Sequence, residues 1–180
     1  MALLILDRDG VINEDSPDYV RSVEQWHPLP GSIEAIAALS RAGFEIVVAS
    51  NQSGLARGYF SLDDLEAMHE KMSGLVEAAG GRIGGVFYCP HHPDEGCSCR
   101  KPRTGLLEAI EREYGLSVSG CYFVGDSVKD VECALARGAV PLLVLTGNGP
   151  AAKAELLARG VPVRVYADLA AVARELLDAA

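Results

Sequence analysis

The chain has 180 residues, of which 49% are hydrophobic and 23% are charged, and its formal net charge at pH 7 is -9. A chain of this length and composition can bury a large apolar core and is typical of a globular domain, not of a disordered segment. The negative charge argues against nucleic acid as a partner, because a phosphate backbone binds to a basic surface. A small phosphorylated substrate remains compatible, since an acidic protein can carry a local cationic pocket.

The sequence contains no apolar run that approaches the ~20 residues of a membrane helix. Its start, MALLILDRDG, is too short and too soon acidic for a secretory signal. We therefore expect a cytoplasmic protein without membrane contact. Three of the five cysteines lie within eleven residues, namely Cys89, Cys97 and Cys99. In a chain without an export signal, this clustering favours a metal site over disulfides.

Short apolar runs alternate with amphipathic segments along the whole chain. The apolar runs, which predict strands buried on both faces of a parallel sheet, are residues 2–6, 46–49, 86–88, 122–124, 142–145 and, less distinctly, 163–166. The helical patterns cover residues 32–42, a segment that begins at Ser61, and residues 105–114, 128–137, 151–158 and 169–177. This alternation predicts a single α/β domain over residues 1–180, a Rossmann-like three-layer sandwich with a mainly parallel sheet.

Three of the predicted strands end at polar residues: Asp7, Ser50 and Asp126. Ligands of open parallel sheets bind at the carboxyl ends of the strands, so we expect these residues to converge on one site. Helix capping would explain any one of them, but a shared site explains all three together. Asp9 adds a further carboxylate, and clustered carboxylates repel one another unless a cation joins them. Mg²⁺ prefers such oxygen ligands, and Asp7 and Asp126 are the candidate pair.

These residues form a pattern that resembles the haloacid dehalogenase superfamily of phosphatases. The pattern consists of Asp7-Arg8-Asp9-Gly10-Val11, Ser50-Asn51, Lys101, and Gly125-Asp126-Ser127 followed by Asp130. The four motifs stand in the family's order and span nearly the whole chain. In that family many members insert a helical lid domain after the first or the second strand. Residues 10–30 and 53–61 leave no room for one, so we expect a capless enzyme with a mobile flap over residues 13–20.

The resemblance implies that Asp7 attacks phosphorus and forms an aspartyl-phosphate, while Asp9 protonates the leaving oxygen and later activates water. It implies that Ser50 and Lys101 hold the phosphoryl oxygens. It also implies a catalytic Mg²⁺ that is held by Asp7, the backbone carbonyl of Asp9, and Asp126. Asp130, a further residue of the pattern, would hold Lys101 or a metal-bound water, or would be an exposed acid in the first turn of a helix.

The stretch of residues 89–103 is rich in Cys, His and Pro and has no regular pattern. Cys89, His91, Cys97 and Cys99 form a Cys₃His set that suits tetrahedral Zn²⁺. Four protein ligands would close the coordination shell, so this zinc would be structural. His92 is the alternative to His91. Residues 89–103 are called the zinc loop below. Because Arg100 and Lys101 directly follow Cys99 in this loop, zinc would also fix Lys101 at the phosphate.

Within the superfamily, CPHHPDEGCSCRKP and the upstream SNQSGLARGYF resemble the D-glycero-D-manno-heptose 1,7-bisphosphate 7-phosphatases, which supply heptose for lipopolysaccharide. This implies a small phosphorylated sugar as substrate, with contacts from Arg8, Asp15, Asp18, Tyr19, Ser50, Asn51, Gln52, Ser53, Arg100 and Lys101. Arg100, a planar bidentate donor, would recognise the second phosphate. Arg57 is a further cationic candidate or a solvated loop residue.

Other interpretations stay open. Histidinol-phosphate phosphatases share these motifs and a similar zinc loop, and their cationic substrate would need an acid such as Glu14, Asp15 or Asp18 at the mouth of the site. A phospho-accepting signalling domain also gathers acids around Mg²⁺, although Asp9 and the zinc loop argue against it. We expect a monomer, with Trp26 in ordinary packing and His69 solvated on a charged helix face.

Overall fold

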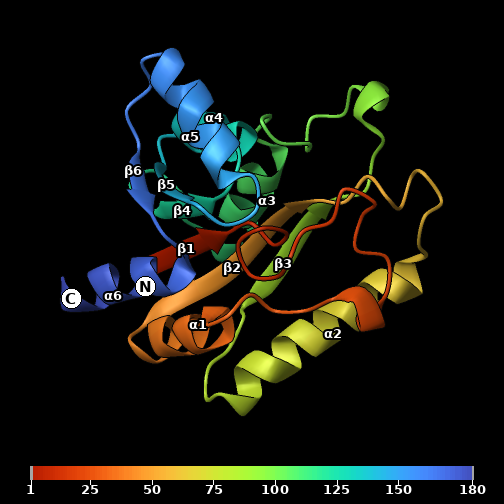
Figure 1. Ribbon diagram of the computed structural model, residues 1–180, viewed down its shortest axis with the longest axis horizontal. Coiled ribbons are helices and arrows are strands. Elements are labelled where there is room, and N and C mark those ends of the chain that lie inside the picture. The colour runs from red at the N-terminus through yellow and green to blue at the C-terminus, as the bar shows by residue number, and fades with distance from the viewer. Residues whose placement is uncertain (1, 180) are drawn as a thin grey trace.

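Six strands form one parallel sheet at the centre of the molecule (Figure 1). The structure is a computed structural model that describes residues 2–179. The strands are β1 (Ala2–Leu6), β2 (Phe44–Asn51), β3 (Gly85–Cys89), β4 (Tyr122–Gly125), β5 (Val140–Val144) and β6 (Arg164–Tyr166). Their order is β3-β2-β1-β4-β5-β6, and every pairing is parallel. From β1 the chain first adds β2 and β3 on one side, and it then adds β4, β5 and β6 on the other side. This reversal creates a switch point between β1 and β4.

Helices connect the strands and cover both faces of the sheet. They are α1 (Ser32–Arg41), α2 (Leu62–Ala78), α3 (Gly105–Tyr114), α4 (Val128–Ala136), α5 (Gly149–Ala158) and α6 (Leu169–Asp178), with short 3₁₀ helices η1 (Val23–Gln25) and η2 (Pro93–Glu95). One face packs against α1, α2 and α6, and the other packs against α3, α4 and α5. The predicted three-layer α/β sandwich is confirmed, and the expected elements end within two residues of the observed ones.

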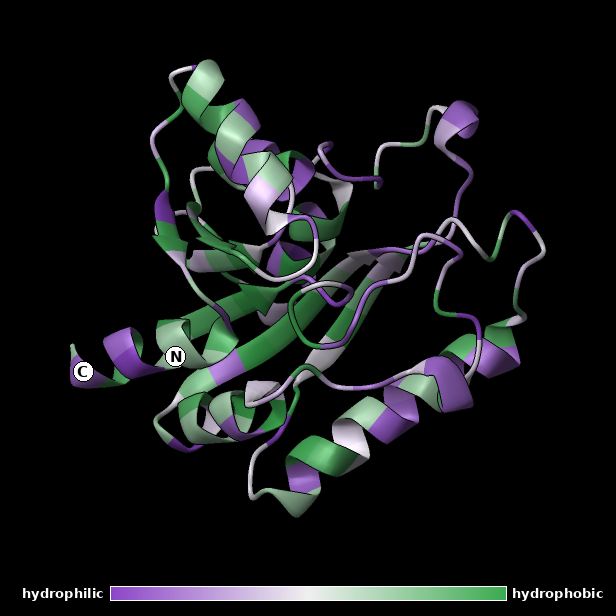
Figure 2. Cartoon of the chain, in the orientation of Figure 1, coloured by the Kyte–Doolittle hydropathy of each residue, from purple (hydrophilic) through white to green (hydrophobic). Residues whose placement is uncertain are grey.

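The strands are apolar on both faces because helices cover both (Figure 2). In β1, Leu4 and Leu6 pack toward α1, α2 and α6, whereas Leu3 and Ile5 pack toward α3 and α4. This double burial explains why β1 appears in the sequence as an uninterrupted apolar run. Trp26 is fully buried in the first of these cores, which confirms its expected packing role.

The two connections at the carboxyl edge of the sheet are short. Residues 7–31 join β1 to α1 and include η1, and residues 52–61 join β2 to α2. Within the described residues neither connection holds a further domain, so the capless architecture is confirmed. Between residues 2 and 179, none of the helices is both long and apolar enough to cross a membrane.

The two connections touch each other through aromatic side chains. The rings of Tyr19 and Tyr59 meet edge to face with their centroids 5.0 Å apart, and the guanidinium of Arg57 lies 5.8 Å from the Tyr19 ring. Tyr19 has a φ of 68°, a left-handed conformation that a bulky residue adopts at a cost of about 1–3 kcal/mol. These contacts hold the expected flap of residues 13–20 in the described arrangement.

Candidate active site

The carboxyl ends of β1, β2 and β4 bring together the polar residues that end these strands. Asp7 and Asp126 line a cavity of about 720 Å³ at the switch point of the sheet. Ser50, at the end of β2, is 1% exposed and is bonded by the Nε2 amide of Gln52, which donates to its Oγ at 2.7 Å. Asn51, Gln52 and Ser53 line the cavity themselves. Asp7 and Asp126 thus meet as expected, whereas Ser50 is buried next to Gln52 and does not line the cavity.

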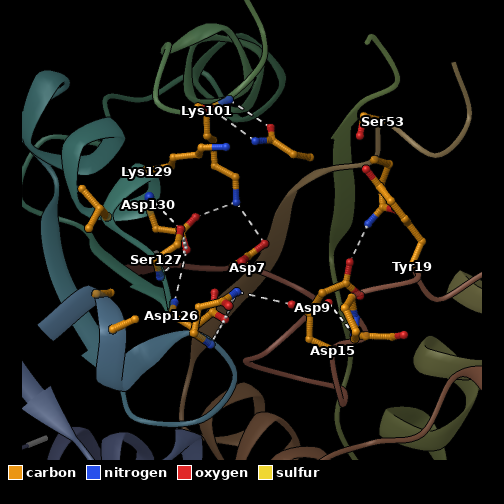
Figure 3. Close-up of a pocket in the computed structure, with 18 of the residues that line it drawn as sticks. Asp7, Asp9, Asp15, Tyr19, Ser53, Lys101, Asp126, Ser127, Lys129 and Asp130 are labelled. Atoms are coloured by element: carbon orange, nitrogen blue, oxygen red, sulfur yellow. Dashed lines mark hydrogen bonds and ion pairs between the residues drawn. The ribbon is translucent and has the colours of Figure 1, made fainter. Parts of the chain in front are cut away.

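Lys101 lies between two carboxylates (Figure 3). Its Nζ donates to Oδ1 of Asp7 at 2.9 Å, to Oδ1 of Asp130 at 2.7 Å, and to the carbonyl of Ala49 at 2.8 Å. Burial lowers the pKa of Lys101, but attraction to Asp130 and Asp7 outweighs burial and raises it overall. Lys101 therefore stays charged, and Asp130 is not the exposed helix acid that was one alternative, because it is 2% exposed.

Three carboxylates at this edge of the sheet could share a cation. Oxygen atoms of Asp7, Asp126 and Asp130 lie within 4.8 Å of one another. The Asp130 carboxylate is already engaged by Lys101 and by the N-terminus of α4, where its Oδ2 accepts from Ser127 Oγ at 2.9 Å. Burial, with repulsion from Asp130, raises the pKa of Asp7 and brings that of Asp126 to about 6. A hard divalent cation between Asp7 and Asp126 would relieve this penalty, so the two residues fit Mg²⁺.

Backbone atoms surround the carboxylate of Asp126 closely. A Cβ atom on Gly10 would lie 2.0 Å from Oδ2 of Asp126, and one on Gly147 would lie 2.3 Å from the same atom. Gly10 also has a φ of +84°, which only glycine adopts readily. The amide of Asn148 donates to this Oδ2 at 2.9 Å. The glycine of the Asp7–Gly10 motif is thus required by the approach of a candidate metal ligand.

Asp9 lines the cavity, and its two carboxylate oxygens differ in the number of hydrogen bonds they accept. Its Oδ1 accepts from Arg8 Nε at 3.0 Å, from Arg8 Nη2 at 2.8 Å, and from Asn13 Nδ2 at 2.9 Å. Its Oδ2 accepts a longer bond of 3.3 Å from Gln52 Nε2. The Oδ2 atom is therefore the one with capacity for a further proton or partner.

Two sequence expectations change at this point. The Arg8 side chain was expected to contact substrate, but it is 0% exposed and does not line the cavity. It lies beneath the cavity because its charge pairs with Asp9. The expectation that His69 is solvated is wrong: its ring is partly buried, and its Nε2 lies 3.2 Å from Nη1 of Arg8.

Two cationic side chains stand near Lys101 around the cavity. Arg100 lines it, and the Nη1 atom of Arg100 is buried without a hydrogen-bond partner among residues 2–179. Lys129, on α4, lines the same cavity and forms no ion pair within the described chain (Figure 3). Burial and the charge of Arg100 lower the pKa of Lys129. Sequence reasoning missed Lys129, although its position in the first turn of a helix that follows a strand-end aspartate was a usable signal.

Residues of the flap line two cavities. Asp15 and Tyr19 line the main cavity, and Asn148 Nδ2 donates to Asp15 at 3.3 Å. Both also line a second cavity of about 420 Å³, and Asp18 lines only this second one, so the structure does not bring Asp18 to Asp7. Arg57 does not line the main cavity either, and it packs near Tyr19.

The zinc loop gathers one nitrogen and three sulfur atoms. Nδ1 of His91 lies 3.5 Å from Sγ of Cys89 and 3.1 Å from Sγ of Cys99, and the sulfurs of Cys89 and Cys97 are 3.6 Å apart. The four ligand atoms lie within 4.8 Å of one another. His92 is used differently, because its Nδ1 accepts from the amide of Asp94 and caps η2. This donor set fits a soft tetrahedral ion.

Two hydrogen bonds join Lys101 of the zinc loop to Asn51 of β2. Asn51 Nδ2 donates to the carbonyl of Lys101 at 3.1 Å, and the amide of Lys101 donates to Asn51 Oδ1 at 2.9 Å. This pair of bonds sets the direction in which the Lys101 side chain leaves the loop. Asn51, expected to contact substrate, thus also positions the backbone of Lys101.

Comparison with known proteins agrees with this geometry. Residues 98–172 match the HAD-hydrolase-like family model. The chain is 55% identical to the D-glycero-beta-D-manno-heptose-1,7-bisphosphate 7-phosphatase of Pseudomonas putida, over 98% of this chain and 100% of that protein. It is 53% identical to the protein of that name from Pseudomonas aeruginosa, over 98% of each.

Solved structures give the same result. The D,D-heptose 1,7-bisphosphate phosphatase from B. bronchiseptica, complexed with magnesium and phosphate, superposes with a TM-score of 0.95 at 48% identity over 100% of both chains. The enzyme of that name from Burkholderia thailandensis gives a TM-score of 0.75 at 39% identity, over 98% of this chain and 99% of that one. Fold and site together define a phosphatase of the haloacid dehalogenase superfamily. Within it, the chain belongs to the family of the D-glycero-beta-D-manno-heptose-1,7-bisphosphate 7-phosphatases.

Proposed function

We propose that the protein hydrolyses the 7-phosphate of D-glycero-D-manno-heptose 1,7-bisphosphate, as a step toward nucleotide-activated heptose. The observation that carries this proposal is a cavity with two cationic regions. Lys101 stands beside the candidate nucleophile Asp7, and Arg100 and Lys129 lie near it without an anionic partner among the described residues. A bisphosphate needs one region for the reacting group and another for the second phosphate. The names of the similar phosphatases support this substrate.

In the proposed reaction, a carboxylate oxygen of Asp7 attacks phosphorus, and the bond between phosphorus and the sugar oxygen breaks. Asp9 gives its proton to that leaving oxygen through Oδ2, the atom with capacity to spare. Water then attacks the aspartyl-phosphate and passes a proton back to Asp9, which releases inorganic phosphate and restores Asp7. Lys101 neutralises charge on the transferring group throughout, and the Ser50 hydroxyl is the second donor to it.

Mg²⁺ is the proposed catalytic cofactor, and it would be held by Asp7, Asp126 and the backbone carbonyl of Asp9. When bound, it would offset the repulsion between an anionic nucleophile and an anionic substrate. The buried, mutually repelling carboxylates support this assignment, as does the magnesium in the similar B. bronchiseptica enzyme.

Zn²⁺ is proposed as a structural ion on Cys89, His91, Cys97 and Cys99. A structural zinc site can contribute on the order of 10 kcal/mol to the ordering of a loop. Here the loop contains Arg100 and Lys101, so the ion would order two cationic side chains of the site.

Histidinol phosphate is the second candidate substrate, because the acids Asp15 and Glu155 line the cavity and could bind its cationic end. The test is phosphate release with Mg²⁺ from heptose 1,7-bisphosphate, as separate α and β anomers, and from histidinol phosphate. We expect preference for the bisphosphate, with the 7-phosphate lost first in ³¹P spectra. The names of the similar enzymes favour the β anomer. Preference for histidinol phosphate would overturn the substrate assignment and leave the mechanism in place.

A further inference from the structure

We propose that His69 is a positioning residue for the phosphatase reaction: acting through the buried guanidinium of Arg8, it holds the Asp9 carboxylate so that Oδ2 faces the substrate. This inference rests on the proposed phosphatase function, but it does not depend on which phosphorylated compound is the substrate. Its basis is a chain of contacts between α2 and the loop after β1, in which His69 and Arg8 are 61 residues apart.

The first link is the complete burial of Arg8, which is 0% exposed. Its Nε and Nη2 donate to Asp9 at 3.0 and 2.8 Å, and Nη2 also approaches Gln52 Oε1 at 3.4 Å. In the part of the chain that the structure describes, the partner of Nη1 is the ring nitrogen Nε2 of His69 at 3.2 Å. A buried N–H donor that loses its acceptor is neither hydrated nor hydrogen-bonded, which is unfavourable, so Arg8 needs His69 to keep this orientation.

The second link is the state of the imidazole. Burial, together with the positive charge of Arg8, lowers the pKa of His69 to about 4, so the ring is neutral at pH 7. Arg8 can only donate, and Nε2 must therefore be the acceptor, which puts the ring proton on Nδ1. The ring packs near Tyr88 with the centroids 6.0 Å apart, and α2 is anchored in the core next to it by Met68 and Met72. His69 thus holds Arg8 from a rigid element.

The third link is what Arg8 does to Asp9. Two donors from Arg8 and one from Asn13 occupy Oδ1, and this leaves Oδ2 as the atom that can exchange a proton with the leaving group and with water. Without His69, the guanidinium loses its third point of attachment and can turn about its stem. The carboxylate would then turn with it, and proton transfer depends steeply on such orientation.

The experiment compares His69→Ala, which removes the acceptor, with His69→Gln, whose Oε1 can replace it. Glu70→Ala, an exposed change on the same helix, is the control. Turnover is measured on heptose 1,7-bisphosphate, where the leaving alkoxide needs a proton, and on p-nitrophenyl phosphate, where the leaving nitrophenolate does not. We expect His69→Ala to lower kcat for the sugar phosphate about 10-fold or more, in the range of general acid catalysis, with KM changed less than about 2-fold. The loss on the nitrophenyl ester should be clearly smaller, and His69→Gln should recover most of the activity.

Equal losses of His69→Ala on both substrates, or an unchanged kcat on the sugar phosphate, would overturn the proposal. So would a Gln variant as impaired as the Ala variant while its thermal unfolding matches that of the wild type. If the Ala variant does not fold, His69→Asn, whose shorter amide reaches less far, takes its place. If the wild type does not hydrolyse heptose bisphosphate, the substrate assignment has failed. The same comparison then uses histidinol phosphate, which also has an alkoxide leaving group, so the two failures are distinguishable.

Discussion

The ammonium nitrogen of Lys101 lies 2.9 Å from Oδ1 of Asp7, although 94 residues separate them in the chain. Both side chains are buried, so their attraction is poorly screened by solvent. The same nitrogen is paired with Asp130 at 2.7 Å. One cation therefore pairs with two buried carboxylates, so the Lys101 side chain that we propose as a catalytic group also has a structural role.

Removal of this cation should affect activity and stability together. We expect Lys101→Met to abolish turnover and to lower the free energy of unfolding by about 3–5 kcal/mol, because two buried charges lose their partner. Urea denaturation and phosphate release measure the two effects. Lys153→Met, an exposed change on α5, is the matched control and should alter neither. A Lys101→Met enzyme with substantial activity would contradict the proposed role in neutralising the phosphoryl group.

Substitution of the two aspartates of the first motif, Asp7 and Asp9, should impair different steps of the reaction. Asp7→Asn should form no phosphoenzyme, since an amide is a poor nucleophile. Asp9→Asn should keep Asp7 reactive but lose about 10²–10⁴-fold in turnover of sugar phosphate, the usual contribution of general acid–base catalysis. Rapid quench with acid, followed by detection of acyl phosphate on the protein, separates the two. Labelled phosphate on the Asp7→Asn protein would show that another residue is the nucleophile.

The Lys129 and Arg100 side chains should determine preference for a second phosphate. We expect Lys129→Ala to raise KM for the bisphosphate about 10-fold, equivalent to about 1.4 kcal/mol, because one charge-assisted contact is lost. For a monophosphate substrate the change should be small. Steady-state kinetics on both substrates measure this, with Arg112→Ala on an exposed position of α3 as the control. An equal rise in KM for both substrates would place Lys129 at the reacting phosphate instead.

Loss of the loop metal should weaken substrate binding before it affects Mg²⁺. Cys97→Ser is expected to reduce bound zinc and to raise KM for substrate, because Arg100 and Lys101 lose the order that the loop gives them. The Mg²⁺ concentration for half-maximal activity should change little, since Asp7 and Asp126 follow strands of the core. Elemental analysis of the zinc content, together with steady-state kinetics, tests this prediction. Normal kinetics in protein shown to lack zinc would contradict a supporting role for the ion.

The stabilising effect of Mg²⁺ should depend on pH. Burial and Asp130 raise the pKa of Asp126 from 3.8 to about 6 in metal-free protein, so protons compete with Mg²⁺ below that pH. Ionisation of Asp126 opposes folding as pH rises through this window, and a bound cation removes the penalty. We expect Mg²⁺ to raise Tm little near pH 5 and fully above about pH 7. An Asp126→Asn control should show little rise at either pH, and a rise in the wild type that does not change with pH would contradict this linkage.

The layers, the parallel sheet and the convergence of Asp7 with Asp126 follow from local signals. Runs of Val, Ile and Leu are buried on both faces, and the polar residues that end them share one edge of the sheet. The zinc loop was equally visible, because three cysteines and a histidine lie close in sequence as well as in space.

Sequence reasoning missed features that depend on how side chains and helices are oriented in the folded chain. His69 looked solvated because a helix face cannot reveal Arg8, 61 residues away, as its partner. Arg8 looked like a substrate contact because it stands between the proposed catalytic residues Asp7 and Asp9, whereas its side chain is fully buried and pairs with Asp9. Whether Lys129 lines the cavity depends on the rotation of α4 about its axis, and the packing of α4 on the sheet sets that rotation.

Because β1 lies between β2 and β4, the candidate nucleophile Asp7 follows a strand with one unpaired edge until late in translation. A chain that has left the ribosome only as far as residue 89 can pair β2 with both β1 and β3, yet it lacks Lys101, Asp126 and Asp130. Asp7 then places an acid at the end of the unpaired edge of β1, which discourages edge-to-edge association. Only a nascent chain that extends through Asn148 can complete the bonds to Asp126. Phosphatase activity should therefore appear only in a nearly complete chain, because the site requires both halves of the sheet to be assembled.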